Sequence, residues 1–396
     1  MEKSRFIKKP FLTIVVVIFV VAAILYIESQ KPKIIVGTES NKNTQTSQKT
    51  ESTFKNPGDG QMTSVEMQKI INEKSTKYPK APDFTGIEKW INSEPLSIEQ
   101  LKGKVVLIDF WTYTCINCIR TLPYLKEWDK KYRDNGLVII GVHTPEFEFE
   151  KKYENVLNAV NQYELKYPIA QDNNYATWRA YQNRYWPHKF LIDIDGYIRY
   201  DHIGEGGYEE TEKVIQGLLK ERMDRLNKNE TVEAEINEPA ETVDVNYSKI
   251  RTPEIYFGYQ FSRGNFGNDE GLKPEQTIDY KMPSSIDANN IYLSGKWKNN
   301  ADNMELDSEE GEIVLTYEAR VLNIVAGSDK QSNISVLLDG KELTDSNRGN
   351  DIEKGSFANA NEYKIYNLIS SDNYDGKTIR IKVSGRGFKI YTFTFG

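Results

Sequence analysis

In the middle of the chain, apolar residues occur in two patterns, short continuous runs typical of buried strands and residues at helical spacing. Residues 104–110 form a short apolar run typical of a buried strand, and residues 119–131 place Leu122, Leu125 and Trp128 at helical spacing. Strands that alternate with helices and then end on a hairpin predict a mixed sheet covered on both faces. The elements expected next are a strand, two helices, two strands and a helix, at residues 136–142, 150–163, 175–185, 188–194, 197–202 and 208–223.

A different pattern begins near residue 251. Apolar and polar residues alternate there, almost nothing has helical period, and turns rich in Gly, Asn and Asp separate the runs. We therefore predict an all-β sandwich of the jelly-roll type over residues 251–396. The clearest strands are expected at residues 312–319, 334–338, 378–383 and 388–395.

Near its start the chain has a long apolar run. Residues 11–27, FLTIVVVIFVVAAILYI, contain one clearly polar side chain and follow Lys3, Arg5, Lys8 and Lys9. The run fits either a short membrane span or a signal peptide. We favour an uncleaved single-pass anchor, because no small-x-small cleavage site closes the run. The preceding positive charges place residues 1–10 in the cytoplasm and the rest of the chain outside the cell membrane.

Two segments lack the apolar residues that a core needs. Residues 28–62 are mostly rich in Asn, Thr, Ser, Gln and Lys, and residues 227–250 carry a run of acidic residues with Pro239 among them. We predict a disordered tether at 28–62 and an acidic linker at 227–250. These segments would separate folded domains at 63–226 and 251–396.

Size and charge narrow the classes of function. A chain of 396 residues exceeds what one core usually organises, and its 38% hydrophobic and 28% charged residues are typical of a folded protein. The formal net charge of -7 argues against a nucleic-acid partner, because binding to phosphates needs clustered Lys and Arg.

The chain has two cysteines, Cys115 and Cys118, at the predicted start of the first long helix. A helix N-terminus favours a thiolate, and a second thiol one turn later can attack a mixed disulfide formed by the first. Cys115 would then be the nucleophile and Cys118 the resolving thiol, with this redox-active pair as the only redox group and no separate cofactor. A structural disulfide would close a two-residue loop and constrain little. Zinc would need two more ligands, which we do not expect.

Three stretches of the sequence resemble a known family. They are VLIDFWTYTCINC with its cysteine pair, GVHTPEFEFE, and RYWPHKFLIDIDG. Over about residues 79–226 the chain resembles the thioredoxin fold of membrane-anchored extracytoplasmic proteins of the TlpA and ResA type, and most of all the DipZ-like group. The resemblance implies an α/β thioredoxin fold and thiol-disulfide exchange.

The resemblance also implies roles for particular residues. Asp109 matches the buried acid that moves a proton to or from the resolving thiol. Pro187 matches a cis-proline that faces the cysteines and pairs with the substrate backbone. Trp111 is expected to pack beside the active site and to contact substrate, with a position in the core as the alternative.

Some positions depart from the family pattern. ResA-like proteins have a glutamate three residues after the second cysteine, where this chain has Thr121, so Asp109 would act alone. Trp186 is bulkier than the residue that usually precedes the proline and would narrow the substrate groove. We also consider His143 and Glu146 as substrate-binding residues, with solvated loop residues as the alternative.

The C-terminal part resembles the carbohydrate-binding-module-like domain that follows thioredoxin in DipZ proteins. Its aromatic residues Tyr256, Phe257, Tyr259 and Trp297 would stack on sugar rings or fill the core, and their spacing favours the core. A glycan or a protein is the expected class of ligand for this domain.

We therefore expect an extracytoplasmic thiol-disulfide oxidoreductase. Ile116 and Asn117 add no positive charge between the cysteines, and this favours reduction of disulfides in client proteins over their introduction. Electrons would come from a separate membrane conductor of the CcdA type. The alternatives are a disulfide-introducing oxidase, a surface binding module, and a thiol peroxidase, for which Thr112 fits but Ile108 does not.

Overall fold

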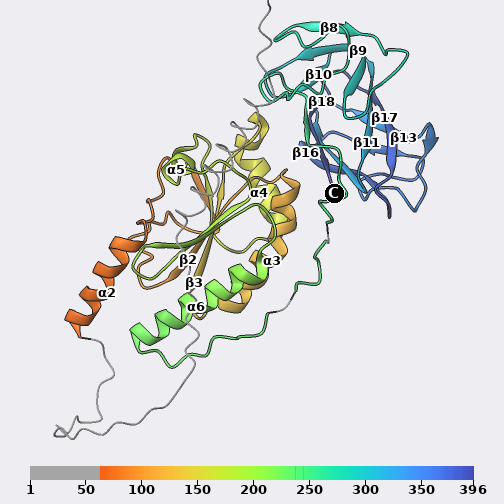
Figure 1. Ribbon diagram of the computed structural model, residues 1–396. Helices are drawn as coiled ribbons and strands as arrows, with labels where there is room; N and C mark the ends of the chain where they lie inside the picture. The colour runs from red at the N-terminus through yellow and green to blue at the C-terminus, as the bar shows by residue number, and fades with distance from the viewer. Residues whose placement is uncertain (1–62, 237, 244) are drawn as a thin grey trace, which may run out of the picture. The chain divides into compact units, whose positions relative to one another are not determined.

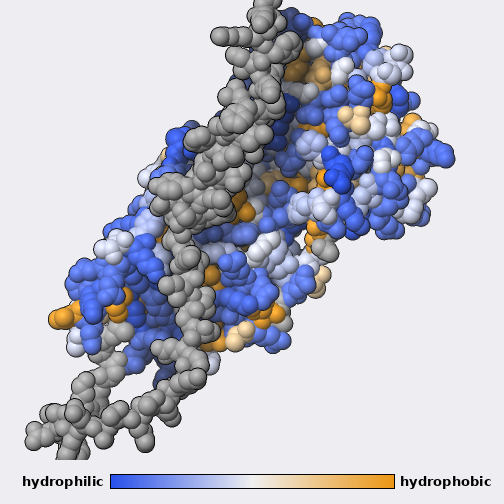
Figure 2. All heavy atoms as spheres, viewed as in Figure 1, coloured by the Kyte–Doolittle hydropathy of each residue, from blue (hydrophilic) through white to orange (hydrophobic). Residues whose placement is uncertain are grey.

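The computed structural model describes residues 63–236, 238–243 and 245–396, which belong to one compact unit. The predicted anchor at 11–27 and tether at 28–62 lie outside the described residues. Within the described part of the chain, no helix has the length and apolar character that a membrane crossing requires. Outside the grey trace, the face shown in Figure 2 is mostly hydrophilic.

Residues 77–226, here called the α/β region, contain a mixed sheet of six strands (Figure 1). The strand order is β1-β4-β3-β2-β5-β6, in which β2, β3 and β4 are parallel and the other pairs are antiparallel. The strands are β1 Lys89–Ile91, β2 Val105–Trp111, β3 Leu137–His143, β4 Ile169–Gln171, β5 His188–Ile192 and β6 Ile198–Ile203. The helices are α2 Ser64–Lys77 before the sheet, α3 Ile116–Tyr132, η1 Glu148–Lys151, α4 Tyr153–Gln162, α5 Ala176–Ala180 and α6 Tyr208–Leu226.

The central strands β2 and β3 are buried on both faces of this sheet. Leu107 and Ile139 point into one core cluster, which α3, α4 and α6 cover with Leu125, Val156 and Ile215 among others. Ile108 and Ile140 belong to a second cluster, covered by α5 and the segment before β2. The predicted mixed sheet with both faces covered is confirmed.

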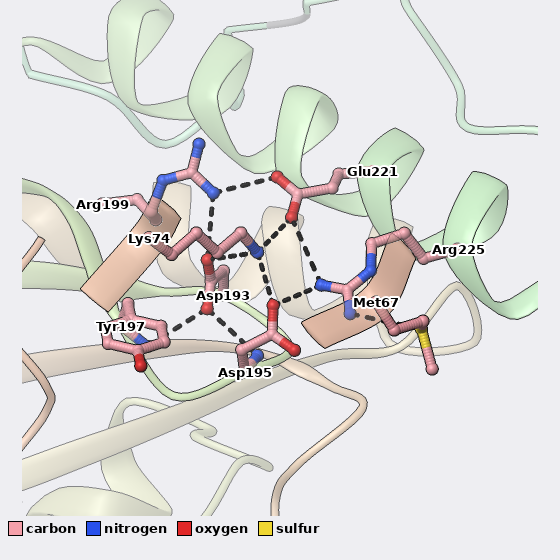
Figure 3. A network of polar contacts seen from close by, with 8 residues as sticks. All are labelled: Met67, Lys74, Asp193, Asp195, Tyr197, Arg199, Glu221 and Arg225. Atoms are coloured by element: carbon pink, nitrogen blue, oxygen red, sulfur yellow. Dashed lines mark hydrogen bonds and ion pairs between the residues drawn. The ribbon is translucent and has the colours of Figure 1, made fainter. Parts of the chain in front are cut away.

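Helix α2 is attached to the α/β region by ion pairs (Figure 3). Lys74 Nζ lies 2.8 Å from Asp193 and 2.5 Å from Asp195 and also pairs with Glu221 of α6. Arg199 lies 2.9 Å from both Asp193 and Glu221, and Arg225 pairs with Asp195. This network joins α2, the β5–β6 hairpin and α6.

Residues 251–396, here called the β region, form one continuous curled sheet of twelve strands. The predicted all-β character is confirmed, whereas the jelly-roll topology stays a prediction. The strands are β7 Ile255–Tyr256, β8 Thr277–Tyr280, β9 Ile291–Asn299, β10 Met304–Leu306, β11 Glu310–Glu318, β12 Val321–Gly327, β13 Asn333–Leu338, β14 Lys341–Glu342, β15 Phe357–Asn359, β16 Lys364–Ser370, β17 Gly376–Ser384 and β18 Lys389–Phe395.

Strand β9 connects the two halves of this curled sheet. Its first residues pair with β11, and its last residues pair with β8 and β10. Gly295 lies at the transition with φ +93°, and a Cβ there would lie 2.9 Å from the carbonyl oxygen of Glu310. Trp297 and Phe388 from one half then pack in the same core as Ile313 and Ile381 from the other.

The acidic segment 227–250 contains no helix or strand among its described residues, and it contacts the α/β region. Lys131 of α3 lies 3.8 Å from Glu233, and Arg222 of α6 lies 3.6 Å from Glu230. Asn135 Nδ2 donates to the Thr231 carbonyl oxygen at 3.2 Å. Part of this predicted linker therefore lies on the surface of α3 and α6.

The helix predicted at residues 175–185 was too long, because only Ala176–Ala180 are helical. Tyr175 and Gln182 have φ values of 57° and 53°, outside the helical region, and they end the helix on both sides. The pattern of apolar residues also did not predict helix α2 or strands β1 and β4.

Candidate functional site

Cys115 is the N-cap residue of α3, four residues after β2 ends. Its Sγ accepts a hydrogen bond from the backbone N–H of Cys118 at 3.2 Å. Cys115 is half-buried, whereas Cys118 is fully buried, and both are free thiols in the structure. Cys115 is therefore the more exposed residue of the pair.

Burial raises the pKa of both thiols above their ordinary value. For Cys115, hydrogen bonding to Cys118 acts in the opposite direction, while the charges of Glu146 and Glu254 raise the pKa further. For Cys118, burial, Cys115 and Asp109 all raise the pKa. Cys115 is the more readily ionised thiol, and Cys118 needs a base to become a nucleophile.

Asp109 lies within β2, is 1% exposed, and has no hydrogen-bond partner at Oδ1. Burial raises its pKa to about 7, an effect that the charge of Lys189 opposes. Lys189 is directly opposite Asp109 on β5, is itself buried, and donates from Nζ to the Gly204 carbonyl oxygen at 3.1 Å. A carboxyl group with this pKa can accept or donate a proton near neutral pH.

The loop after β3 is held next to Cys115 by Glu150. This fully buried carboxylate accepts hydrogen bonds from the Thr114 hydroxyl at 2.5 Å and from the backbone N–H groups of Glu146 and Phe147 at 2.6 and 2.9 Å. Glu146 is half-buried, and its Oε1 accepts a hydrogen bond from the Tyr256 hydroxyl at 2.9 Å. Burial, followed by the charges of Glu150 and Glu254, raises the pKa of Glu146 to about 8.

His143 and Trp111 both lie in the core behind this loop. His143 is 0% exposed, its Nε2 lies 3.3 Å from Thr112 Oγ1, and burial lowers its pKa to about 3. Trp111 is 1% exposed and packs edge-on against the His143 ring. Neither side chain presents a surface to a substrate in this structure, so the geometry does not favour the substrate contacts considered from the sequence.

The peptide bond between Trp186 and Pro187 is cis, which confirms the prediction from the sequence. Pro187 is buried, and its carbonyl oxygen accepts a hydrogen bond from the Gly204 N–H at 2.8 Å. Trp186 is half-buried, packs against Trp178 and donates from Nε1 to the Thr144 carbonyl oxygen at 3.0 Å. Trp186 thus contacts the loop that carries Glu146.

Thr121 occupies the position at which ResA-like proteins have a glutamate. It is fully buried, donates to the Asn117 carbonyl oxygen at 3.0 Å and lies 3.3 Å from the Tyr208 hydroxyl. A neutral hydrogen-bonded group therefore fills this position, and Asp109 is the acid within β2.

The aromatic residues proposed for sugar stacking are mostly part of the core. Tyr256, Phe257 and Trp297 are buried, as the spacing indicated. Tyr259 is half-buried and donates from its hydroxyl to Glu275 at 3.0 Å.

Within the described ranges, the cluster of acidic, His or Cys side chains that best fits a metal ion is Asp193, Asp195 and Glu221. Lys74 already pairs with all three carboxylates, so the charge that a cation would supply is present. The cysteines are not part of this cluster.

Two residues of the site, Glu150 and Lys189, were not identified from the sequence, and Tyr256 was considered there only for sugar stacking or core packing. Glu150 belongs to a run of alternating Glu and Phe, in which no pattern separates a buried carboxylate from solvated ones. Lys189 stands two residues after Pro187 in an apolar strand, and this unusual position for a lysine was the one available signal.

Two protein families match the chain. The family described as Redoxin matches residues 77–219, and the family described as Thioredoxin like C-terminal domain matches residues 252–396. The two matches together cover most of the α/β region and nearly all of the β region.

Three curated proteins illustrate the relatives. Protein DipZ of Mycobacterium tuberculosis (strain CDC 1551 / Oshkosh) is 35% identical over 321 residues, which are 80% of this chain and 43% of DipZ. Thiol-disulfide oxidoreductase YkuV of Bacillus subtilis (strain 168) is 31% identical over 35% of this chain and 94% of its own length. Thiol-disulfide oxidoreductase ResA of Bacillus thuringiensis (strain Al Hakam) is 33% identical over 37% of this chain and 79% of its own length. The chain thus spans less than half of DipZ and most of the other two.

Proposed function

We propose that this chain, which belongs to the thioredoxin-like thiol-disulfide oxidoreductases, reduces disulfide bonds in client proteins outside the cell membrane. The observation that carries the proposal is the arrangement of the two free thiols. Cys115 is accessible at the N-terminus of α3, and Cys118 is buried one turn later. This is the order of access that a nucleophile and a resolving thiol require.

The reaction has two exchange steps. The Cys115 thiolate attacks one sulfur of the client disulfide, a bond forms between the two sulfurs, and the other client sulfur leaves as a thiolate and takes up a proton. Cys118 then loses its proton and attacks Cys115 Sγ, which releases the first client sulfur. Two electrons pass to the client, and the Cys115–Cys118 disulfide is the oxidised product.

Asp109 is the proposed base for the second step. Its pKa of about 7 allows it to take the Cys118 proton near neutral pH, and its charge acts on Cys118. Lys189 would hold the ionised carboxylate once the proton has moved, because it faces Asp109 across the two strands.

Pro187 is the proposed contact to the client backbone, a role that the family resemblance implies. Trp186 is proposed to narrow the substrate groove and to contact the client there. Trp186 is half-buried and fixed by its bond to Thr144, a position that suits the edge of a substrate groove.

The protonation of Cys115 supports the reductive direction. Strong oxidants of this fold stabilise the nucleophilic thiolate, whereas here burial and two nearby carboxylates raise the pKa of Cys115. We propose that a separate membrane conductor of the CcdA type returns electrons to the pair. The anchor at 11–27, and a glycan or protein ligand for the β region, remain proposals from the sequence.

A trapping experiment tests the assignment of the cysteines. Cys118→Ser should accumulate mixed disulfides with client proteins, because the resolving attack is lost while Cys115 remains, and Cys115→Ser should accumulate none. Equal yields from the two variants would contradict these roles. A complete absence of mixed disulfides from both would favour the surface binding module.

A glutathione redox titration of the full chain, with thiol trapping in intact cells, tests the direction. Reductants of this fold lie near about -270 mV and a strong oxidant near about -120 mV. A potential above about -150 mV with the pair mostly oxidised in cells would show a disulfide-introducing enzyme. Rapid turnover of hydrogen peroxide with no activity on peptide disulfides would show a peroxidase.

A further inference from the structure

Tyr256 of the β region contacts the loop beside Cys115. The hydroxyl of Tyr256 lies within hydrogen-bond distance of two carboxylates, Glu146 Oε1 at 2.9 Å and Glu254 Oε2 at 3.3 Å. Glu146 belongs to the loop beside Cys115, whereas Glu254 and Tyr256 belong to β7 and the residue before it. One hydroxyl group therefore connects a carboxylate of each region.

Two further contacts bring the β region close to the active-site helix. Tyr113, two residues before Cys115, donates from its hydroxyl to the Tyr363 carbonyl oxygen at 3.4 Å. At Arg120, in the second turn of α3, the guanidinium lies so close to Gly396 that a Cβ built there would be 2.3 Å from Nη2. The β region therefore contacts residues on both sides of Cys115 in the sequence.

Aromatic packing fixes this contact. The ring of Phe147, next to Glu146, lies with its centroid 5.0 Å from that of Tyr391 and 5.9 Å from that of Phe261. The ring of Phe149 lies 5.1 Å from that of Tyr363. All these partners belong to the β region, so the loop that carries Glu146 is packed between the two regions.

The bridged pair of carboxylates favours retention of one proton. A tyrosine hydroxyl has a single proton and can donate it to one carboxylate at a time, and two carboxylates this close disfavour double ionisation. Burial raises the pKa of both Glu146 and Glu254, and Glu150 adds a like charge near Glu146.

Two arginines moderate this effect. The Arg263 guanidinium lies 4.9 Å from the Tyr256 ring centroid and lowers the pKa of both carboxyl groups. The charge of Arg120 acts on Glu254. The groups that act on the pair are therefore Glu150, two arginines, Tyr256 and the Cys115 thiol, and with the pair itself the three acids outnumber the two cations.

We propose that the β region completes the redox site, with Glu254 as a positioning residue that keeps a proton on Glu146 for exchange with the client sulfur at Cys115, and with Tyr256 as the residue that holds the two carboxylates together. This inference rests on the proposed thiol-disulfide exchange. In the first step the Cys115 thiolate, which has released its proton to solvent, forms the new sulfur–sulfur bond, and Glu146 gives its proton to the departing client sulfur. A proton from solvent then restores Glu146 and balances the one that Cys115 released, so no other reactant is needed.

The test compares full-length Glu254→Gln and Tyr256→Phe with Tyr259→Phe. Tyr259 is a matched control, since its hydroxyl bonds to Glu275 in the same region. The first readout is the pH profile of peptide-disulfide reduction. Without the Glu254 carboxylate, Glu146 loses its proton at a lower pH. The alkaline limb of the profile should therefore shift to lower pH by about one pH unit in Glu254→Gln. Tyr256→Phe should move the limb to higher pH instead, because the lost hydroxyl donor stabilised the ionised form of Glu146, and Tyr259→Phe should not move it.

The second readout is the rate of Cys115 alkylation by iodoacetamide against pH, in a Cys118→Ser background. At pH 6 Glu146 keeps its proton with or without Glu254, so loss of the Glu254 charge should let Cys115 ionise more readily, and its alkylation at that pH should rise several-fold in Glu254→Gln. A merely structural contact would not raise this alkylation and also move the alkaline limb of reduction to lower pH.

Two outcomes separate this inference from the proposed function. If both profiles of Glu254→Gln and Tyr256→Phe match those of the unchanged chain, the β region has no part in proton exchange, although the chain is still a reductase. If the unchanged chain reduces no disulfide, the proposed function fails and the inference falls with it. Should Tyr256→Phe unfold, Glu254→Gln decides alone, because it removes one charge and keeps the shape of the side chain.

Discussion

Asp109 and Lys189 lie directly opposite each other on the antiparallel strands β2 and β5, and both side chains are buried. Burial disfavours the charged form of each, and each charge favours that of the other. The pair therefore places two ionisable groups of opposite sign below the cysteines.

Asp109→Asn should make the protein more stable at alkaline pH. The folded pKa of about 7 exceeds the ordinary value of 3.8, so stability is lost as the pH rises between these values, and an amide removes that loss. The stability gain of the variant should be roughly 2 to 3 kcal/mol larger at pH 8 than at pH 5. Urea unfolding at both pH values measures it, and an equal gain at the two would contradict a raised pKa.

Lys189→Met should shift the pH profile of disulfide reduction to higher pH. Without the cation the pKa of Asp109 rises further, so the ascending limb of peptide-disulfide reduction should move to higher pH by about one pH unit. Lys104→Met is the control, because Lys104 is exposed directly before the start of β2. An unchanged limb in Lys189→Met would remove this lysine from the proton path.

Lys74→Ala should destabilise the α/β region. The change leaves Asp193, Asp195 and Glu221 with fewer counter-charges, and we expect a loss of about 2 kcal/mol because Arg199 and Arg225 still pair with them. Thermal unfolding measures the loss. Lys69→Ala on the exposed side of the same helix should change almost nothing, and equal effects of the two variants would show that helix propensity alone is at work.

Glu150→Gln should loosen the loop beside Cys115. An amide puts a donor where the carboxylate accepts from Glu146 and Phe147, so about 1–3 kcal/mol of stability should be lost. Glu148→Gln, at an exposed position of the same 3-10 helix, serves as control. Faster hydrogen exchange at the Glu146 and Phe147 amides is the local sign of the effect, and unchanged exchange would contradict the capping role.

The sequence was most informative where function depends on neighbours along the chain. Cys115 and Cys118 share one helical turn, which their spacing alone indicates. Asp109, six residues before Cys115, and Pro187 were assigned from the family resemblance, which also follows the order of residues along the chain. These features need no knowledge of how distant segments meet.

Features that depend on tertiary contact were not accessible. Strands β1 and β4 have three residues each, too few to show alternation. Helix α2 has a mostly polar surface and is held by ion pairs to the β5–β6 hairpin and α6 rather than by an apolar stripe. Glu150 and Tyr256 act through partners that lie 36 and 110 residues away.

The full burial of Cys118 behind Cys115 has a consequence for oxidative damage. An oxidant from solvent meets Cys115 first and converts it to a sulfenic acid. The neighbouring thiol condenses with that group, releases water and forms a disulfide before a second oxidation can make an irreversible sulfinic acid. The arrangement that orders the two exchange steps thus also protects the enzyme in oxidising surroundings. The product of the damage is the Cys115–Cys118 disulfide, which is also the oxidised form in the proposed reaction.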